Sequence, residues 1–261
     1  MLMQRDKAHA VVRGGAKARR AEHDKLGVSA AMVAAALVAA ALPAPGVAGN
    51  RASPAPSAWA TAPRMPRHHS RGPVPIVKQA LRNNCETAAL SMLLAAHGVR
   101  VSQLKLQREL PRSGPLDPVA AAGGGLPIWG DPDRGFVGRV AGGGTSGGFG
   151  VYPHPIRELA RRHGVALVPL TRRPLAQILA RLRAGRPVMV WIGLSDGSYR
   201  TWKTPRGKTV RANFGEHTVV LTGMQGSSVT VNDPLDGKRK VWTQSYLASA
   251  WQHLGRRALG T

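Results

Sequence analysis

Cys85 is the only cysteine among the 261 residues of the chain. A single thiol cannot form an intramolecular disulfide, so the fold has to be held by a buried apolar core and not by a disulfide framework. The apolar fraction of 43% is sufficient for such a core, and the length suits one sizeable domain with a tail, or at most two small domains. The cysteine itself is then a buried inert thiol, an intermolecular bridge or a reactive group.

The first 48 residues predict an export signal peptide or an N-terminal membrane anchor. Basic side chains precede an uncharged run over residues 28–44, and small residues at positions 46 and 48 suit cleavage after Ala48. The run is short for a transmembrane helix, which needs about 20 apolar residues, but Ala and Val can extend it to Ala48. We therefore expect a secreted or extracytoplasmic protein of the cell envelope, with membrane contact only if this segment is not cleaved.

A linker and one folded domain are expected after the signal. Residues 49–73 are dominated by Pro, Ser and Ala and contain little that could be buried. His68 and His69 lie in this stretch, but no further metal ligands flank them at a usable spacing. Over residues 74–261, apolar runs alternate with turn residues, which is typical of a folded domain.

The apolar periodicity of this domain predicts its secondary structure. A helix that begins near Asn84 or Cys85 has an apolar stripe and ends at Gly98, where a glycine cap belongs. Residues 111–150 lack periodicity and predict one long loop. The other expected elements are helices over 102–110, 155–163, 175–184 and 244–252, strands over 165–168, 187–194, 217–224, 229–231 and 240–242, and a hairpin over 199–211. Helices first and antiparallel strands last indicate an α+β domain in two lobes.

Cys85 has the local surroundings of a reactive thiol. At the predicted N-terminus of a helix, free backbone N–H groups and the positive end of the helix dipole stabilise a thiolate. Gln79 lies six residues upstream, where its side-chain amide and the backbone N–H of the cysteine could both donate to a developing oxyanion. A glutamine before a helix is common, so Gln79 alone carries little information.

His217 has the position that a general base needs, in contrast to the other eight of the nine histidines. Those eight lie in the tail or linker, beside a glycine at a helix end, in a turn or near the C-terminus. His217 opens a predicted apolar strand directly after a loop, so its ring can face a cleft while the strand holds it. Asp233 ends the next predicted strand and could orient the imidazole, although an Asp before a Pro is also a common turn former.

The order Gln79, Cys85, His217, Asp233 resembles that of the papain-like cysteine peptidases. The closer resemblance is to bacterial cysteine peptidase family 39, whose members process bacteriocin leaders, and to its stand-alone relatives. The matching stretches are 74–79, 84–87, 91–93, 129–132, 135–138, 185–188, 217–223 and 232–234. This resemblance implies a papain-like two-lobed fold, with an N-terminal helical lobe and a C-terminal antiparallel sheet. It also implies that Cys85 is the nucleophile, His217 the general base, Asp233 the orienting carboxylate and Gln79 the oxyanion donor.

Two features depart from the leader-processing members of that family. Glu86 follows the nucleophile where many of them have Gly, whereas the stand-alone relatives share the Cys-Glu pattern. The sequence shows no transporter segments, and export is expected, so a cytosolic double-glycine leader does not fit as the substrate. The predicted function is that of a cysteine peptidase acting on a peptide or protein substrate outside the cytoplasm.

The net charge of +24 favours anionic partners such as acidic envelope polymers, although a solvated basic surface with a compositional bias is the favoured explanation of the charge. The sequence has neither the cysteine and histidine spacing of a zinc finger nor an RNA-binding motif, so neither feature indicates specific binding of nucleic acid. No metal or organic cofactor is predicted. Two alternative functions stay open: a related acyltransferase that uses the same residues, and a catalytically inactive papain-like domain that binds peptide or anionic envelope polymer.

Overall fold

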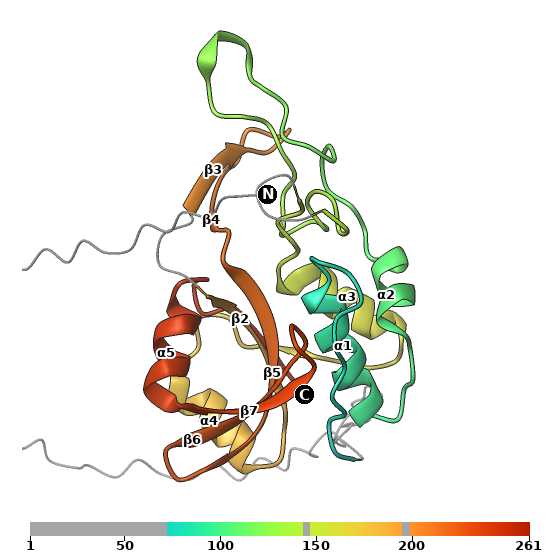
Figure 1. Ribbon diagram of the computed structural model, residues 1–261, viewed down its shortest axis with the longest axis vertical. Coiled ribbons are helices and arrows are strands. Elements are labelled where there is room, and N and C mark those ends of the chain that lie inside the picture. Colours follow the sequence, from blue (N-terminus) through green and yellow to red (C-terminus); the bar gives the residue numbers. More distant parts are fainter. Residues whose placement is uncertain (1–71, 143–146, 195–198) are drawn as a thin grey trace, which may run out of the picture. The chain divides into compact units, whose positions relative to one another are not determined.

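The computed structural model describes residues 72–142, 147–194 and 199–261 (Figure 1). The predicted signal over residues 1–48 and almost all of the predicted linker over residues 49–73 lie outside the described residues, so both stay predictions. Within the described part of the chain, no helix is long and apolar enough to cross a membrane.

Five α-helices and eight short strands make up the described part of the chain. The helices are α1 (Cys85–Ala96), α2 (Gln103–Glu109), α3 (Pro153–Arg162), α4 (Leu175–Arg183) and α5 (Gln244–Gln252). The strands are β1 (Val168–Pro169), β2 (Val188–Gly193), β3 (Tyr199–Lys203), β4 (Thr209–Asn213), β5 (Glu216–Gln225), β6 (Ser228–Asp233), β7 (Lys238–Thr243) and β8 (Ala258–Gly260). All five predicted helices are present, and α3 begins earlier than predicted because Pro153 is tolerated at the first helical position.

Helix α1 begins at Cys85, as predicted, and is buried almost all round, because α2 and α3 lie beside it and β5 packs against it. The predicted apolar stripe is therefore only part of a largely apolar surface. The end of α1 follows the predicted glycine cap: Gly98 has a φ of +82°, and the N–H of Val99 bonds to the carbonyl of Leu94.

Six strands form one antiparallel sheet in the order β1-β8-β2-β5-β6-β7, and β3 pairs with β4 in a separate hairpin. In the sheet, Ile192 of β2 pairs with His217, and Val220 of β5 pairs with Asn232. This register brings the start of β5 to the same end of the sheet as the end of β6, so His217 and Asp233 lie close together.

The six-stranded sheet has helices on both faces (Figure 1). Met189 and Trp191 of β2 belong to the apolar cluster that contains α1 and α3. Val188, Val190 and Ile192 belong to the second cluster, with α4 and α5. Side chains of a strand alternate between the two faces of its sheet, so β2 is buried on both of them. The predicted α+β class is confirmed, with α4 and α5 covering the face of the sheet opposite α1.

The predicted long loop contains the short 3₁₀ turn η1 (Ala122–Gly124) and packs firmly against the β3–β4 hairpin. The Trp129 and Trp202 rings meet edge to face, with centroids 5.4 Å apart, and the Trp202 indole N–H donates to the carbonyl of Gly130 at 2.7 Å. Lys208 of the hairpin turn binds Asp131 and Asp133 of the loop at 3.1 and 2.8 Å. These contacts fix the hairpin beside the site described below.

Two strands differ from the sequence prediction. The strand predicted over residues 165–168 is reduced to β1, although Val165 and Leu167 are buried in the core. Strand β8 was not predicted at all, because three residues are too few to show a period. It exists because Ala258–Gly260 pairs with β2, which lies far away in the sequence.

Candidate active site

A cavity of about 400 Å³ lies at the N-terminal end of α1 and contains three of the four predicted site residues. Cys85, His217 and Gln79 line it, and so does Glu216, the first residue of β5. The remaining lining residues are Arg82, Asn83, Gly148, Phe149, Leu194, Tyr199, Arg200, Phe214 and Leu235. The cavity therefore joins the helix that carries the thiol, the strand that carries the imidazole, and the β3–β4 hairpin.

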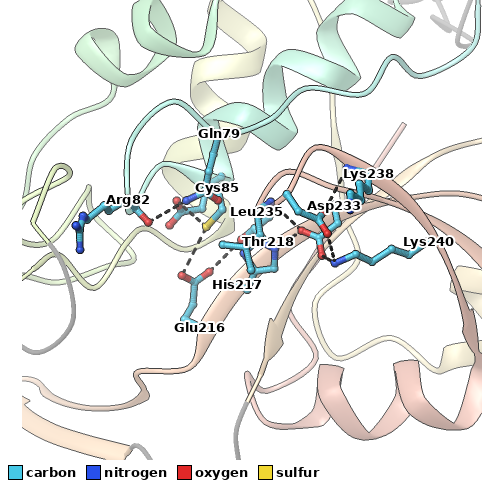
Figure 2. Close-up of polar contacts among 12 residues, drawn as sticks. Gln79, Arg82, Cys85, Glu216, His217, Thr218, Asp233, Leu235, Lys238 and Lys240 are labelled. Carbon is cyan, nitrogen blue, oxygen red and sulfur yellow. Dashed lines mark hydrogen bonds and ion pairs between the residues drawn. The ribbon is translucent and has the colours of Figure 1, made fainter. Parts of the chain in front are cut away.

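The Cys85 thiol points into a polar pocket formed by two carboxyl groups. Its Sγ lies 3.4 Å from Oε2 of Glu86 and 3.9 Å from Oε2 of Glu216. Figure 2 shows the contact between Cys85 and Glu216. The backbone N–H of Thr218 also bonds to the sulfur. Cys85 is only 5% exposed. The hydrogen bonds of its sulfur within the described residues thus run to the two glutamates and to β5, and not to the His217 ring.

Burial and the two neighbouring carboxylates raise the pKa of the Cys85 thiol well above its usual value. Burial disfavours the thiolate because the anion loses its hydration, and the charges of Glu216 and Glu86 repel it. The bond from the Thr218 N–H acts in the opposite direction and is the weaker effect. Activation of this thiol therefore depends on the charge state of its surroundings as well as on the helix N-terminus.

Glu86 and Glu216 are held against each other by their own hydrogen bonds. Glu86 is fully buried, and its Oε1 accepts the N–H of Val151 at 2.7 Å. The Oε1 of Glu216 accepts the hydroxyl of Thr218 at 3.0 Å. Burial raises the pKa of Glu86 to about 7. Burial and the charge of Glu86 raise the pKa of Glu216 well above its usual value. Both shifts favour the retention of a proton in this cluster.

His217 and Asp233 form the buried pair that the sequence predicted as base and orienting carboxylate. The Nε2 of His217 lies 2.7 Å from Oδ1 of Asp233, and each side chain is 4% exposed. The other oxygen of Asp233 binds Nζ of Lys240 at 2.6 Å (Figure 2). With Nε2 engaged by Asp233, the Nδ1 of His217 is the ring nitrogen left to exchange a proton with a nucleophile.

The environment of Asp233 keeps its carboxylate charged. Burial alone would raise its pKa, but the bonds from His217, Lys240 and the N–H of Leu235 outweigh burial and lower the pKa below the ordinary aspartate value. Asp233 can therefore hold the imidazole in one orientation over the whole working range of pH. Lys240 was not recognised in the sequence, because β7 gives no local sign that its second lysine would reach a carboxylate on β6.

Residues 74–79 form a strap that fastens the start of the domain to β6. The side-chain amide of Asn232 donates to the carbonyls of Val74 and Pro75 at 3.1 and 3.0 Å. The N–H of Gln79 donates to the carbonyl of Pro234 at 2.7 Å. The strap therefore brings Gln79 to the cavity next to the end of β6, where Asp233 lies.

The side-chain amide of Gln79 is bound to backbone carbonyls, whereas an oxyanion donor needs a free N–H that faces the cavity. Its Nε2 donates to the carbonyls of Leu81 and Arg82, each at 2.9 Å. Its Oε1 is buried without a hydrogen-bond partner among the described residues. Both amide hydrogens are thus occupied, and donation to an oxyanion would require the amide to turn. The role of Gln79 stays a prediction.

One cluster in the described residues has the spacing that a metal ion needs. Cys85, Glu86 and Glu216 offer ligand atoms that lie within 4.8 Å of one another. One of those atoms is the sulfur of the predicted nucleophile, so we regard the cluster as the environment of the thiol and assign no metal to it. Glu216 was missed in the sequence because its role follows from the packing of β5 against α1, which brings together residues far apart in the chain.

The domain is similar to known proteins over nearly its whole length. The sequence profile of the Peptidase_C39 like family matches residues 72–259. The uncharacterized protein YvpB of Bacillus subtilis (strain 168) is 31% identical over 185 residues, which are 69% of this chain and 69% of that protein. The crystal structure of a putative C39-like peptidase from Bacillus anthracis matches with a TM-score of 0.61 and 28% identity, covering 72% of this chain and 93% of that chain.

A more distant likeness is to a double glycine motif protease from an AMS/PCAT transporter, solved in complex with the leader peptide. It matches with a TM-score of 0.42 and 16% identity, over 73% of this chain and 93% of that chain. A likeness of this size says nothing about the substrate of the present protein.

Proposed function

Because this chain belongs to the Peptidase_C39 like family, we propose that it is a cysteine peptidase that hydrolyses peptide bonds outside the cytoplasm. The predicted family and the predicted α+β fold are confirmed by the matched profile and by the solved C39-like structure. Peptidase chemistry follows from the family in general terms. The roles of individual residues, the substrate and the site of action are part of the proposal.

The observation that carries the proposal is the cavity that Cys85 shares with His217, whose ring is bound by Asp233. Cys85 lies at the N-terminus of α1, where unpaired backbone N–H groups favour negative charge. The imidazole lies on β5 and is oriented by a charged carboxylate on β6. A nucleophile, a base and an orienting group on three rigid elements are the parts that acyl transfer by a thiol requires.

The proposed reaction begins when the thiol proton of Cys85 passes to Nδ1 of His217. The thiolate adds to the carbonyl carbon of a peptide bond, and the electron pair of the carbonyl moves to its oxygen. The backbone N–H of Cys85 donates to that oxyanion, and Gln79 does so if its amide turns. The C–N bond then breaks, and His217 gives its proton to the leaving amine. Water, deprotonated by His217, releases the acyl group as a carboxylic acid and restores the thiol.

The cavity walls suit a peptide segment. Phe149 and Phe214 give it an aromatic side, with ring centroids 5.5 Å apart, and Tyr199 lies on the hairpin beside them. Arg200 lies over the Phe214 ring at 4.5 Å. We propose that an extended peptide lies across these rings toward Cys85, because flat apolar surfaces with polar edges bind peptide backbone and side chains together.

The rate of alkylation of Cys85 against pH tests the proposal most directly. In the full chain, we expect a labelling rate that falls when His217 is replaced by Ala, because the imidazole takes the thiol proton. Labelling that is indifferent to His217→Ala would mean an unactivated thiol and would leave a peptide-binding domain as the function. A peptide library incubated with the wild-type chain and with Cys85→Ala then identifies the cleaved bonds. Cleavage that persists in Cys85→Ala would contradict the nucleophile assignment.

The products separate hydrolysis from acyl transfer. Hydrolysis gives two peptides, one with a new carboxylate, whereas an acyltransferase gives crosslinked or amine-exchanged products when a primary amine is added. We expect hydrolysis, and mass spectrometry of the products with and without a lysine-containing acceptor peptide decides between the two reactions.

Export and contact with the envelope are proposed from the sequence alone. The basic and apolar segment over residues 1–48 supports export, and the net charge of +24 supports contact with anionic envelope polymers. A fusion of residues 1–48 to a reporter enzyme that is active only after export should show reporter activity. Deletion of residues 28–44 should abolish it, and an unchanged reporter signal would contradict the proposal.

A further inference from the structure

The thiol of Cys85 makes its side-chain hydrogen bonds to carboxyl groups and not to its proposed base. Sγ donates to Oε2 of Glu86 at 3.4 Å, and Oε2 of Glu216 lies on the same side at 3.9 Å. A proton held in this way is directed away from His217, so the proposed reaction cannot begin until the arrangement changes. The inference below rests on the proposed function, because it concerns how that nucleophile becomes ionised.

The two carboxyl groups are close enough to act as a single acid. One oxygen of each carboxyl group and the Cys85 sulfur lie within 4.8 Å of one another, in a place where Glu86 is fully buried. Two carboxylates this close do not both ionise readily, because each charge disfavours the other, and the burial of Glu86 adds to this effect. Two carboxyls and a thiol are thus competing to lose a proton within one pocket.

Gly150 shows that the chain is shaped around this pair. It has a φ of +118°, a conformation that side chains rarely adopt. A Cβ at this position would overlap Oε1 of Glu86 and would lie 3.2 Å from Oε2 of Glu216. Glycine lets the backbone pass against both carboxyls, and the next residue, Val151, uses its N–H to bind Glu86 at 2.7 Å.

The charged groups around the pair have fixed positions. Arg257, ahead of β8, lowers the pKa of Glu216 and stacks over the Tyr152 ring at 3.6 Å. His217 follows Glu216 on β5, with its partner Asp233 on β6 already neutralised by Lys240. Arg82 and Arg200 line the cavity on the side of α1 and on the hairpin. Among these charged groups, the carboxylates are the pair itself and Asp233, whose charge is neutralised by Lys240.

We propose that Glu86 and Glu216 share one proton and thereby control the ionisation of Cys85. When the pair holds this proton, a carboxyl O–H can donate to the sulfur and stabilise the thiolate. When the pair is fully ionised, it can only accept, so the thiol keeps its proton. The direction of the hydrogen bond between Glu86 and Cys85 therefore reverses with the protonation of the pair. Glu86 and Glu216 touch the reacting sulfur and are further residues of the catalytic site.

The consequence is an upper pH limit that ordinary thiol catalysis does not have. As pH rises through the range in which the pair loses its shared proton, the thiolate becomes harder to form, although the rise in pH itself favours it. The protein should therefore work best at mildly acidic to neutral pH. Removal of the charge of either glutamate should extend the pH range of activity to higher pH.

The test measures alkylation of Cys85 in the full chain from pH 5 to pH 10, with iodoacetamide and with EDTA present throughout. The variants are Glu86→Gln and Glu216→Gln, and the matched control is Glu158→Gln, which changes an exposed glutamate on α3. Gln at position 86 keeps an acceptor for the Val151 N–H and offers an N–H to the sulfur. Circular dichroism and the unfolding midpoint show which variants are folded, and if one of the two is not, the other decides.

We expect both glutamine variants to be alkylated about threefold or more faster than the wild type between pH 7 and pH 9. Such a change corresponds to a fall of about half a unit in the pKa of the thiol. Glu158→Gln should match the wild type. Rates within about 1.5-fold of the wild type in the folded glutamine variants would overturn the inference.

The same experiment distinguishes failure of this inference from failure of the proposed function. His217→Ala reports on the imidazole alone, and its labelling rate tests the Cys–His pair. If His217→Ala slows labelling while the glutamine variants do not change it, the peptidase proposal stands and the role of the pair is wrong. If the glutamine variants speed labelling and His217→Ala has no effect, the pair controls the thiol but His217 is not its base.

Discussion

Gly150 lies directly against the carboxyl group of Glu86, so closely that any side chain at position 150 would overlap Oε1. The two residues are 64 positions apart in the sequence, yet the conformation of one is set by the side chain of the other. The contact explains why a glycine with a φ of +118° stands at the point where the long loop enters α3.

Replacement of Gly150 by Ala should destabilise the domain by about 3 kcal/mol or more, because a strained φ and an overlap with a buried carboxyl add together. The control is Gly164→Ala, at a φ of +78° with nothing within 4 Å of the new Cβ. That variant should lose only about 1 kcal/mol, from backbone strain alone. Urea unfolding of both variants measures the difference, and equal losses would contradict the contact described here.

Asp233→Asn should lower turnover by a factor on the order of 10² to 10⁴, because a neutral amide no longer favours the imidazole orientation and charge that the reaction needs. Asp236→Asn is the matched control, since Asp236 also binds Lys240, at 3.1 Å, but does not touch His217. The control should stay within about threefold of the wild type. The rate constant for a cleaved library peptide is the measurement, and equal effects of the two variants would refute the orienting role of Asp233.

The buried Glu86 predicts a loss of stability as pH rises. Its pKa is raised in the folded state to about 7 by burial, so the fold favours the protonated form. The stabilising contribution is complete below the unfolded pKa of about 4.3 and is lost as pH rises through 7. The free energy of unfolding should therefore fall between pH 4.5 and pH 7.5.

Glu86→Gln should make that pH dependence less steep, because glutamine does not titrate and only Glu216 of the pair remains. Urea unfolding of the wild type and the variant at both pH values gives the two slopes. Glu158→Gln, which removes an exposed carboxylate, should leave the slope as it is. A slope in Glu86→Gln equal to that of the wild type would show that Glu86 does not titrate in this range.

Lys208→Met should weaken peptide binding more than it weakens the fold. Lys208 is half exposed, so its pairs with Asp131 and Asp133 contribute less than about 1 kcal/mol to stability. They hold the hairpin whose Tyr199 and Arg200 line the cavity. We expect a higher KM with little change in kcat, and no change in either for Lys203→Met on the same hairpin. A fall in kcat at constant KM would show that the hairpin acts on the chemistry instead.

The helix and strands that carry the predicted residues begin and end where the neighbouring residues require it, and the sequence therefore predicts them. Helix α1 begins at Cys85, just ahead of its predicted apolar stripe, and is followed by Gly98, a glycine with a positive φ. His217 is the second residue of β5 and Asp233 is the last residue of β6, because each lies at a change between apolar residues and a turn. Neighbouring strands then place these two side chains together, as the sequence order suggests.

The surroundings of the thiol could not be predicted in this way. Glu216, which contacts Cys85, lies 131 positions further along the chain, and Lys240, which binds Asp233, lies on a separate strand. No local pattern marks such contacts, because they depend on how β5 packs against α1 and how β7 pairs with β6. The sequence also presents Gln79 in the expected place, while only the structure shows that its amide is bound by two backbone carbonyls.

The strap of residues 74–79 gives the domain a mechanical property. Hydrogen bonds from Asn232 and to Pro234 fasten it to β6, on either side of Asp233. A pulling force applied to the chain ahead of Val74 would therefore be transmitted to the end of β6, where Asp233 binds the imidazole, before it reached α1. Tension on the N-terminal side would change the spacing between base and nucleophile, so this geometry makes the site sensitive to force in the chain that precedes it.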